Sequence, residues 1–417
     1  MLRRMLLSFT LGVVLCQRAL SGEPLLEKQE LFVAGSGGYA AYRIPALLVT
    51  TQGSLLAACE ARKTRGDWAA IDILLRRSDD GGQTWSPAQT MSQVPGPPRK
   101  NPAALKQKLA DPSVVTNNNP LLIADRQTGL VHLLFCQEYL RCFYCRSDDD
   151  GKTFTKPVEI TAAFEPFRKV YDWNVLATGP GHGIQLKSGR LVAPVWLSTG
   201  KGGHAHRPSI VTTLYSDDHG GSWQCGEIVA GEVDPLMNPS ESVAVELANG
   251  RVLINMRSEA ANHLRATATS ADGATSWTRP AFDDELLEPI CMASMCRLSE
   301  ASTGGKNRIV FSNPHNLDKA KGTAEPGKSR DRKNLSIKLS YDETESWPIS
   351  KTLESGPSAY SDLAVGSDGA IYCLYERTSE SPKPPGPSLI LARFNLAWLT
   401  DEQDSLSTAN SAAANTK

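Results

Sequence analysis

The 417-residue sequence has no large excess of either charge, because it contains 44 Lys and Arg residues and 45 Asp and Glu residues, for a net charge of −1. A balance of this kind gives no broad attraction to nucleic acid or to an anionic surface, so neither is expected as a partner. Any anion site must therefore be built locally. After the N-terminal segment, no apolar run reaches the roughly 18 residues that a membrane-spanning helix needs.

Metal-ligand spacing is also scarce. Cys142 and Cys145 have the C-x2-C spacing of many zinc and redox pairs. A second such pair is missing, because Cys291 and Cys296 are five residues apart and have no histidine nearby. We therefore expect buried thiols or a local disulfide at these cysteines, and neither a metal nor a cofactor.

The first 21 residues have the features of a secretory signal. Arg3 and Arg4 supply a positive start, residues 5–16 a short apolar run, and residues 19–21 the small residues of a cleavage site. This predicts export to a periplasm or to the medium, or to a lumen in a eukaryotic cell. Residues 22–400 are expected to form one domain, and the Ser-, Ala- and Asn-rich residues 401–417 a disordered tail.

An eight-residue pattern, Ser-x-Asp-x-Gly-x-Thr-aromatic, recurs along that domain. Three good copies and two eroded ones occupy residues 78–85, 147–154, 216–223, 270–277 and 340–347. Their starts lie 69, 69, 54 and 70 residues apart, a spacing typical of stacked supersecondary units such as propeller blades. The Asp can accept hydrogen bonds from the amides that follow it, and Gly permits positive φ where the chain turns.

Strand-like runs precede the copies, as in residues 71–75, 210–215 and 335–339, and convincing amphipathic helices are scarce. The chain is therefore expected to be all-β. The repeated octapeptide resembles the Asp box of the sialidases, which are six-bladed β-propellers. The resemblance spans about residues 30–395 and is to the bacterial type, glycoside hydrolase family 33. Because non-enzymatic propellers also carry Asp boxes, the motif alone implies the fold and not catalysis.

Three arginines match the sialidase residues that clamp the carboxylate of the substrate. Arg43 lies in the Tyr-Arg-Ile-Pro motif, Arg257 ends a strand-like run, and Arg332 precedes another. Arg330 competes with Arg332 for the third position. Guanidinium groups stay charged and bind carboxylates through a planar, often bidentate fork. The family pattern also implies that Glu376 orients Arg43.

The resemblance implies a tyrosine nucleophile, Tyr360. A phenol with a pKa near 10 is a poor nucleophile alone, so a base must stand beside it. Glu241 matches the family's glutamate for that role. Sialic acid carries a carboxylate on its anomeric carbon, which would repel an anionic nucleophile, and sialidases are a tyrosine exception among glycosidases.

The acid/base group is expected in the polar loop of residues 61–70. Asp67 follows Arg62 by five residues and matches the family's catalytic acid, while Arg62 resembles a further arginine near the substrate carboxylate and C4 hydroxyl. Asp72 is the second choice, but its place within a strand favours a structural role. Asn119 and Asp111 both resemble the segment that contacts the N-acetyl pocket, and only one of them can hold that place.

These features together predict an exo-α-sialidase that acts on sialylated glycans, glycoproteins or glycolipids with retention, through a covalent tyrosyl intermediate. A non-catalytic propeller that binds glycans or proteins is one alternative. A same-fold enzyme acting on another acidic sugar, or transferring sialic acid to an acceptor, is the other.

Overall fold

The computed structural model describes residues 22–201, 203–233, 235–303, 305–320, 324–378 and 386–406. The predicted signal segment, residues 1–21, and the predicted tail beyond residue 406 lie outside this part. The regular secondary structure of the described residues is almost entirely antiparallel sheet, as the sequence predicted. None of the helices within the described residues is long and apolar enough to cross a membrane.

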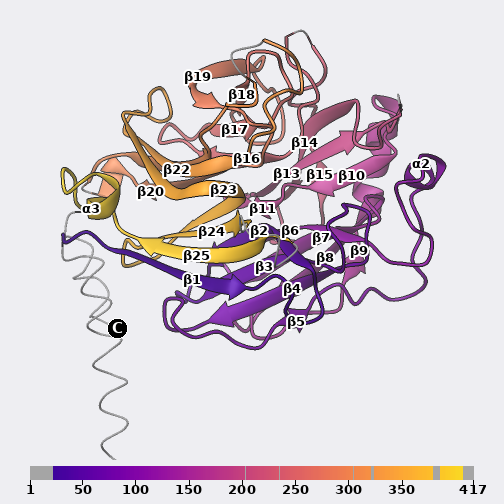
Figure 1. Cartoon of the computed structure of the whole chain (residues 1–417), viewed down its shortest axis with the longest axis horizontal. Helices are drawn as coiled ribbons and strands as arrows, with labels where there is room; N and C mark the ends of the chain where they lie inside the picture. Colours follow the sequence, from indigo (N-terminus) through magenta and orange to yellow (C-terminus); the bar gives the residue numbers. More distant parts are fainter. Residues whose placement is uncertain are drawn as a thin grey trace, which may run out of the picture.

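The strands form six blades, numbered here in chain order (Figure 1). Blade 1 contains β2 (Ala41–Val49), β3 (Leu55–Arg62), β4 (Ile71–Ser78) and β5 (Gln89–Thr90). Blade 2 contains β6 (Asn117–Ala124), β7 (Val131–Gln137), β8 (Arg141–Ser147) and β9 (Val158–Glu159), with β11 (Gly181–His182) added in parallel to β6. Blade 3 contains β10 (Val175–Thr178), β13 (Leu191–Ser198), β14 (Ser209–Ser216) and β15 (Gln224–Cys225), with β12 (Ile184–Gln185) paired to β13.

The second half of the chain builds three more blades. Blade 4 contains β16 (Ser242–Glu246), β17 (Val252–Met256), β18 (Leu264–Ser270) and β19 (Ala281–Leu287). Blade 5 contains β20 (Ser294–Ser299), β21 (Arg308–Pro314), β22 (Lys333–Ser340) and the first part of β23 (Ile349–Val365). Blade 6 contains the rest of β23, β24 (Ile371–Arg377), β25 (Ser388–Phe394) and the N-terminal β1 (Leu26–Phe32).

The ring is closed by pairing the two ends of the described chain. The N-terminal strand β1 runs antiparallel to β25, with Leu26 opposite Phe394, and Figure 1 shows indigo β1 beside yellow β25. Helical segments are short: α2 (Pro102–Lys106), η1 (Thr161–Lys169), η2 (Ala301–Thr303) and α3 (Leu396–Leu399). After α3, Arg308 pairs with Asp404 at 2.7 Å, and the described chain continues to residue 406.

Strands inside a blade read as nearly continuous apolar runs because neighbouring blades cover both of their faces. All eight residues of β3 are buried, as are all eight of β13. Leu47 and Leu55 of blade 1, for example, share a core cluster with Leu374 and Leu391 of blade 6. The main core thus lies between blades, and each blade is stable only beside its neighbours.

The five Asp-box copies each connect the third and fourth strands of a blade, in blades 1 to 5. In the first copy, Asp80 accepts hydrogen bonds from the Thr84 N–H (2.9 Å) and hydroxyl (2.6 Å). The equivalent Asp carboxylates accept the amide N–H of Thr153, Ser222, Thr275 and Ser346 at 2.8–2.9 Å. The predicted hydrogen bonds to Asp are confirmed in all five copies. Gly takes the positive φ in the first four, whereas the fifth has no Gly and Glu343 and Thr344 adopt φ of +63° and +80° instead.

Candidate active site

The predicted residues come from different blades, yet all lie at the same end of their strands. Neighbouring strands within a blade are antiparallel, so the start of the first strand lies beside the end of the second. Arg43 is the third residue of β2 and Arg62 ends β3, while Glu241 precedes β16 and Arg257 follows β17. A pocket of about 210 Å³ at this end is lined by the predicted Arg43, Arg62, Asp67, Asn119, Glu241, Arg257, Arg332 and Tyr360.

Tyr360 lies just beyond the point where β23 passes from blade 5 to blade 6, and only 4% of it is exposed. Its hydroxyl is 2.7 Å from both carboxylate oxygens of Glu241 and donates to that carboxylate. The hydroxyl also accepts a hydrogen bond from Arg257 Nη1 at 2.8 Å. Burial, followed by the charge of Glu241, raises the pKa of Tyr360 against the lowering effect of three arginines, so the phenol is neutral in the free protein.

The three predicted clamp arginines surround this phenol. Arg43 and Arg332 place their guanidinium carbons 5.2 and 5.1 Å from the centre of the Tyr360 ring, and Arg257 contacts both Tyr360 and Glu241. Arg332 donates to the Ile290 carbonyl at 3.2 Å through Nε and at 2.5 Å through Nη2. Arg332 thus lies beside the Tyr360 ring, whereas Arg330 pairs with Glu259 at 2.8 Å.

Glu376 holds Arg43, as the family pattern implied. It accepts from Arg43 Nε (3.1 Å) and Nη2 (3.3 Å), and also from the Ile44 N–H at 2.9 Å. Ile44 has φ of +56°, a strained value for a β-branched residue, at a β-bulge before Pro45. The buried carboxylate therefore fixes both the bulge and the guanidinium that projects from it.

The next blade repeats this device around Glu60, a residue that the sequence reasoning did not single out. Asn119, also before a proline and with φ of +55°, donates its N–H to Glu60 at 2.8 Å. Glu60 is fully buried and accepts from Arg62 Nε (2.8 Å) and Nη2 (2.6 Å). The sequence did contain a signal for Glu60, because a glutamate inside the apolar run of β3 requires a buried partner.

Asp67 also lines this pocket, with half of its side chain exposed. It pairs with Arg62 Nη1 at 2.7 Å and Arg43 Nη1 at 3.6 Å. Burial acts to raise the pKa of Asp67, but the two guanidiniums outweigh it and hold the pKa below its usual range. Asp72 accepts a hydrogen bond from the Tyr39 hydroxyl at 2.7 Å and does not line the pocket, as expected for a structural residue.

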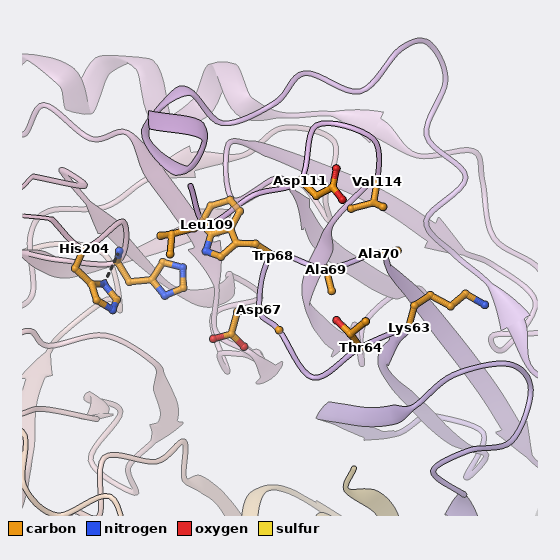
Figure 2. A pocket seen from close by; sticks show the side chains of 12 residues that line it. Lys63, Thr64, Asp67, Trp68, Ala69, Ala70, Leu109, Asp111, Val114 and His204 are labelled. Atoms are coloured by element: carbon orange, nitrogen blue, oxygen red, sulfur yellow. Dashed lines mark hydrogen bonds between the residues drawn. The ribbon is translucent and has the colours of Figure 1, made fainter. Parts of the chain in front are cut away.

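The two candidates for the N-acetyl position lie apart. Asn119 is buried and lines the arginine pocket, with its Nδ2 donating to the Thr178 carbonyl at 3.0 Å. Asp111 lines a neighbouring cavity of about 560 Å³ and accepts from the Ser113 N–H and hydroxyl at 2.8 and 2.6 Å. Figure 2 shows Asp111 on a different loop from Asp67, with Trp68 between them in the view. Asp111 is not among the residues that line the arginine pocket.

Aromatic side chains from blades 1, 2 and 3 gather around His206, a pocket-lining residue of the loop after β13. Tyr139, Trp196 and Trp68 surround His206, with ring centres 4.8, 5.3 and 5.6 Å from the imidazole. Burial lowers the pKa of His206 to about 4, so the ring is neutral near pH 7. No spacing in the sequence pointed to these residues, because only the arrangement of blades brings them beside Asp67.

No group of three or more His, Cys, Asp or Glu side chains within the described ranges has a metal-binding arrangement. The eight described cysteines are free thiols, six of them buried and Cys225 and Cys296 partly so. The buried-thiol alternative for Cys142 and Cys145 is therefore the one that the structure supports.

Comparisons with known proteins agree with this geometry. The family model for a BNR repeat-like domain matches residues 53–373. Mouse Sialidase-2 is 30% identical over 388 residues, covering 85% of this chain and 92% of the mouse protein. This chain belongs to the sialidase family. A sialidase of Micromonospora viridifaciens is 32% identical over 405 residues, covering 91% of this chain and 55% of that protein.

This sialidase-family chain spans little more than half the length of the bacterial relatives, 55% of the Micromonospora protein and 61% of one from Bacteroides fragilis. Among solved structures, the Hadza microbial sialidase Hz136 matches with a TM-score of 0.68 and 25% identity, over 88% of this chain and 68% of that one. Trypanosoma rangeli sialidase, at 20% identity and a TM-score of 0.65 over 91% of this chain and 60% of that one, shares the propeller fold.

Proposed function

We propose that the protein is an exo-α-sialidase, which hydrolyses terminal α-linked sialic acid from glycans, glycoproteins or glycolipids with retention of configuration. The observation that carries the proposal is the Tyr360–Glu241 hydrogen bond, 2.7 Å long, at the centre of three arginines. A buried phenol with an adjacent carboxylate is a nucleophile with its base, and the arginines supply a site for the carboxylate of a sialic acid.

In the first step, the Tyr360 oxygen bonds to the anomeric carbon while its proton passes to Glu241. The bond from that carbon to the glycosidic oxygen breaks, and Asp67 donates a proton to the departing oxygen. In the second step, water attacks the same carbon and gives a proton to Asp67. The tyrosyl bond breaks, and the phenolate recovers its proton from Glu241. Two inversions give overall retention.

Asp67 has a low pKa in the free protein, and its ion pair with Arg43 provides the means by which a bound substrate can raise that pKa. Arg43 contacts both Asp67 and the ring of Tyr360, so a bound substrate carboxylate would share this arginine. An added negative charge beside Asp67 disfavours its ionised form and raises its pKa. Substrate binding would therefore prepare the acid for proton transfer.

The proposal is tested with an α-sialoside that carries a fluorogenic leaving group, comparing wild type with Tyr360→Phe. We expect turnover by wild type and at least about a 1000-fold loss in the variant, because the nucleophile is removed. Labelling of Tyr360 by a difluorinated sialic acid, detected by peptide mass spectrometry, checks the covalent intermediate. Equal turnover by the two proteins would exclude the mechanism, and no turnover by either would favour a glycan-binding propeller.

A further inference from the structure

A second charged cluster borders the arginine pocket and has no place in the proposed chemistry. Its centre is Glu259, whose side chain is 9% exposed. One oxygen, Oε1, accepts from Arg207 Nη2 at 2.5 Å and from Arg330 Nη2 at 2.8 Å. The other, Oε2, accepts from Asn238 Nδ2 at 3.1 Å. We call Arg207, Arg330 and Glu259 the outer cluster.

The outer cluster is fixed in place by its backbone as well as by its side chains. Glu259 donates its N–H to the Met237 carbonyl at 2.8 Å, and its own carbonyl accepts the Gly327 N–H at 3.0 Å. On the segment that carries Arg330, the Ser329 hydroxyl donates to the Glu288 carbonyl at 2.6 Å. These bonds tie blades 4 and 5 together beneath the two arginines.

The charge of the outer cluster is unbalanced. Two guanidiniums share one carboxylate, which leaves a net charge of +1 where the Arg207 and Arg330 side chains are 32% and 48% exposed. Within the described residues each arginine makes a single side-chain hydrogen bond, so most of its five N–H donors face the pocket or solvent. Burial and the nearby Arg257 and Arg207 lower the pKa of Arg330, as expected where cations are crowded.

All three residues also line the pocket that holds Arg257, Arg332 and Tyr360. In a sialoside, the carbon that carries the clamped carboxylate also carries the glycosidic oxygen. The leaving group departs toward Asp67, the proposed acid. His204 interacts electrostatically with Asp67 and also with Arg207, Glu259 and Arg330, so the outer cluster borders the Asp67 side of the pocket. The two arginines of the outer cluster can therefore bind an anionic group on the leaving-group side of the substrate.

We propose that Arg207 and Arg330 form a subsite for a second anionic group, so that the protein prefers sialosides whose penultimate sugar is itself acidic. The inference rests on the proposed function, because it assumes that the arginine clamp holds a terminal sialic acid. The second anion is either the carboxylate of an inner sialic acid or a sulfate ester on the sugar next to the terminal residue.

The test compares 3′-sialyllactose with α2,8-disialyllactose, with the same disialoside whose inner carboxylate is a methyl ester, and with 3′-sialyllactose sulfated on galactose. For wild type, we expect kcat/KM to be about 10-fold higher for the free disialoside than for its inner ester, as for a lost charge-assisted hydrogen bond. Arg330→Gln and Arg207→Gln should each reduce this ratio at least about threefold. Lys201→Gln, which changes an exposed lysine paired with Asp172, should leave the ratio unchanged.

A preference for the sulfated compound over 3′-sialyllactose, lost in the same variants, would identify sulfate as the anion. The inference would be overturned if wild type showed no preference, with a kcat/KM ratio near one for both acidic compounds. It would also be overturned if Arg330→Gln and Arg207→Gln left the preference intact. Neither result would affect the proposed sialidase activity. Calorimetric binding of the same compounds separates the two proposals. Selective binding of the free disialoside without turnover would support the outer cluster and reject catalysis, and no binding would reject both.

Discussion

At the scale of single residues, the site is a set of arginines each held by an acceptor. Glu376 holds Arg43, Glu60 holds Arg62, and the Ile290 carbonyl holds Arg332. A guanidinium whose rotamers are already restricted loses less entropy when a substrate carboxylate binds. The carboxylates thus act chiefly by pre-organisation, and Asp67 and Glu241 are the two that would also move protons.

Replacing Asp67 by Ala should lower kcat by an amount that depends on the leaving group of the substrate. For a natural sialoside, whose sugar alkoxide leaves poorly, we expect kcat to fall about 100- to 10,000-fold, the usual contribution of a general acid. For a nitrophenyl or fluorogenic sialoside the loss should be much smaller, because that leaving group needs no proton. Steady-state kinetics on the two substrates check this, and an equal loss on both would assign Asp67 a purely structural role.

The pH dependence should reveal the coupling between Asp67 and the substrate. In the free protein, Arg62 and Arg43 hold the pKa of Asp67 low. The protonated form of Asp67 is therefore lost as the pH rises through this low pKa. In the proposed complex, the substrate carboxylate would raise that pKa. On sugar leaving groups, the decline of kcat should therefore lie at higher pH than the decline of kcat/KM. Coincident declines in the two profiles would contradict the coupling.

At the scale of elements, the repeated turn is a structural device separate from the site. Asp149 accepts the Thr153 N–H at 2.8 Å and its hydroxyl at 2.6 Å, whereas its neighbour Asp148 is exposed. Five such turns join third and fourth strands, so the sequence repeat reports blade geometry and says nothing of chemistry. The sixth blade has no copy, because its outer strand β1 comes from the other end of the domain.

Asp149→Ala should lower the free energy of unfolding by about 1 kcal/mol through loss of these bonds, and Asp148→Ala by less than about 0.5 kcal/mol. The bonds to Thr153 outweigh burial and lower the pKa of Asp149 to about 2, below its value in the unfolded chain. Its contribution is therefore present above about pH 4 and fades as pH falls toward 2. Urea unfolding at pH 7 and pH 3 measures both effects, and equal losses in the two variants would show that the turn bonds are not responsible.

At the scale of the whole molecule, closure of the ring positions the site. Arg43 is on blade 1 and Glu376 on blade 6, the two blades that the closing strand β1 joins. In β1, Phe32 is 4% exposed and packs on Tyr42 with ring centres 5.4 Å apart. The pairing of Arg43 with its carboxylate thus depends on contacts made at the far ends of the domain.

Phe32→Ala should therefore destabilise the fold by roughly 3–5 kcal/mol, the usual cost of truncating a buried phenylalanine. The adjacent Val33→Ala should cost less than about 0.5 kcal/mol, because that side chain is 39% exposed. Chemical denaturation measures both. A small effect of Phe32→Ala would mean that ring closure contributes little to stability, and activity measured well below the melting temperature shows whether the site is also displaced.

The sequence by itself determined the all-β repeat and the Asp-box turns, because these rest on local turn chemistry. Its resemblance to sialidases singled out the arginines, the tyrosine and the acids of the candidate site through motifs of neighbouring residues. Only the tertiary structure decided that Arg332 rather than Arg330 stands beside Tyr360, and that Asn119 but not Asp111 lines the pocket. It alone disclosed His206 and the outer cluster, and it supplied the partners of the buried Glu60. These distinctions depend on distances between blades, which arise from closing the ring and leave no trace in any local stretch of the chain.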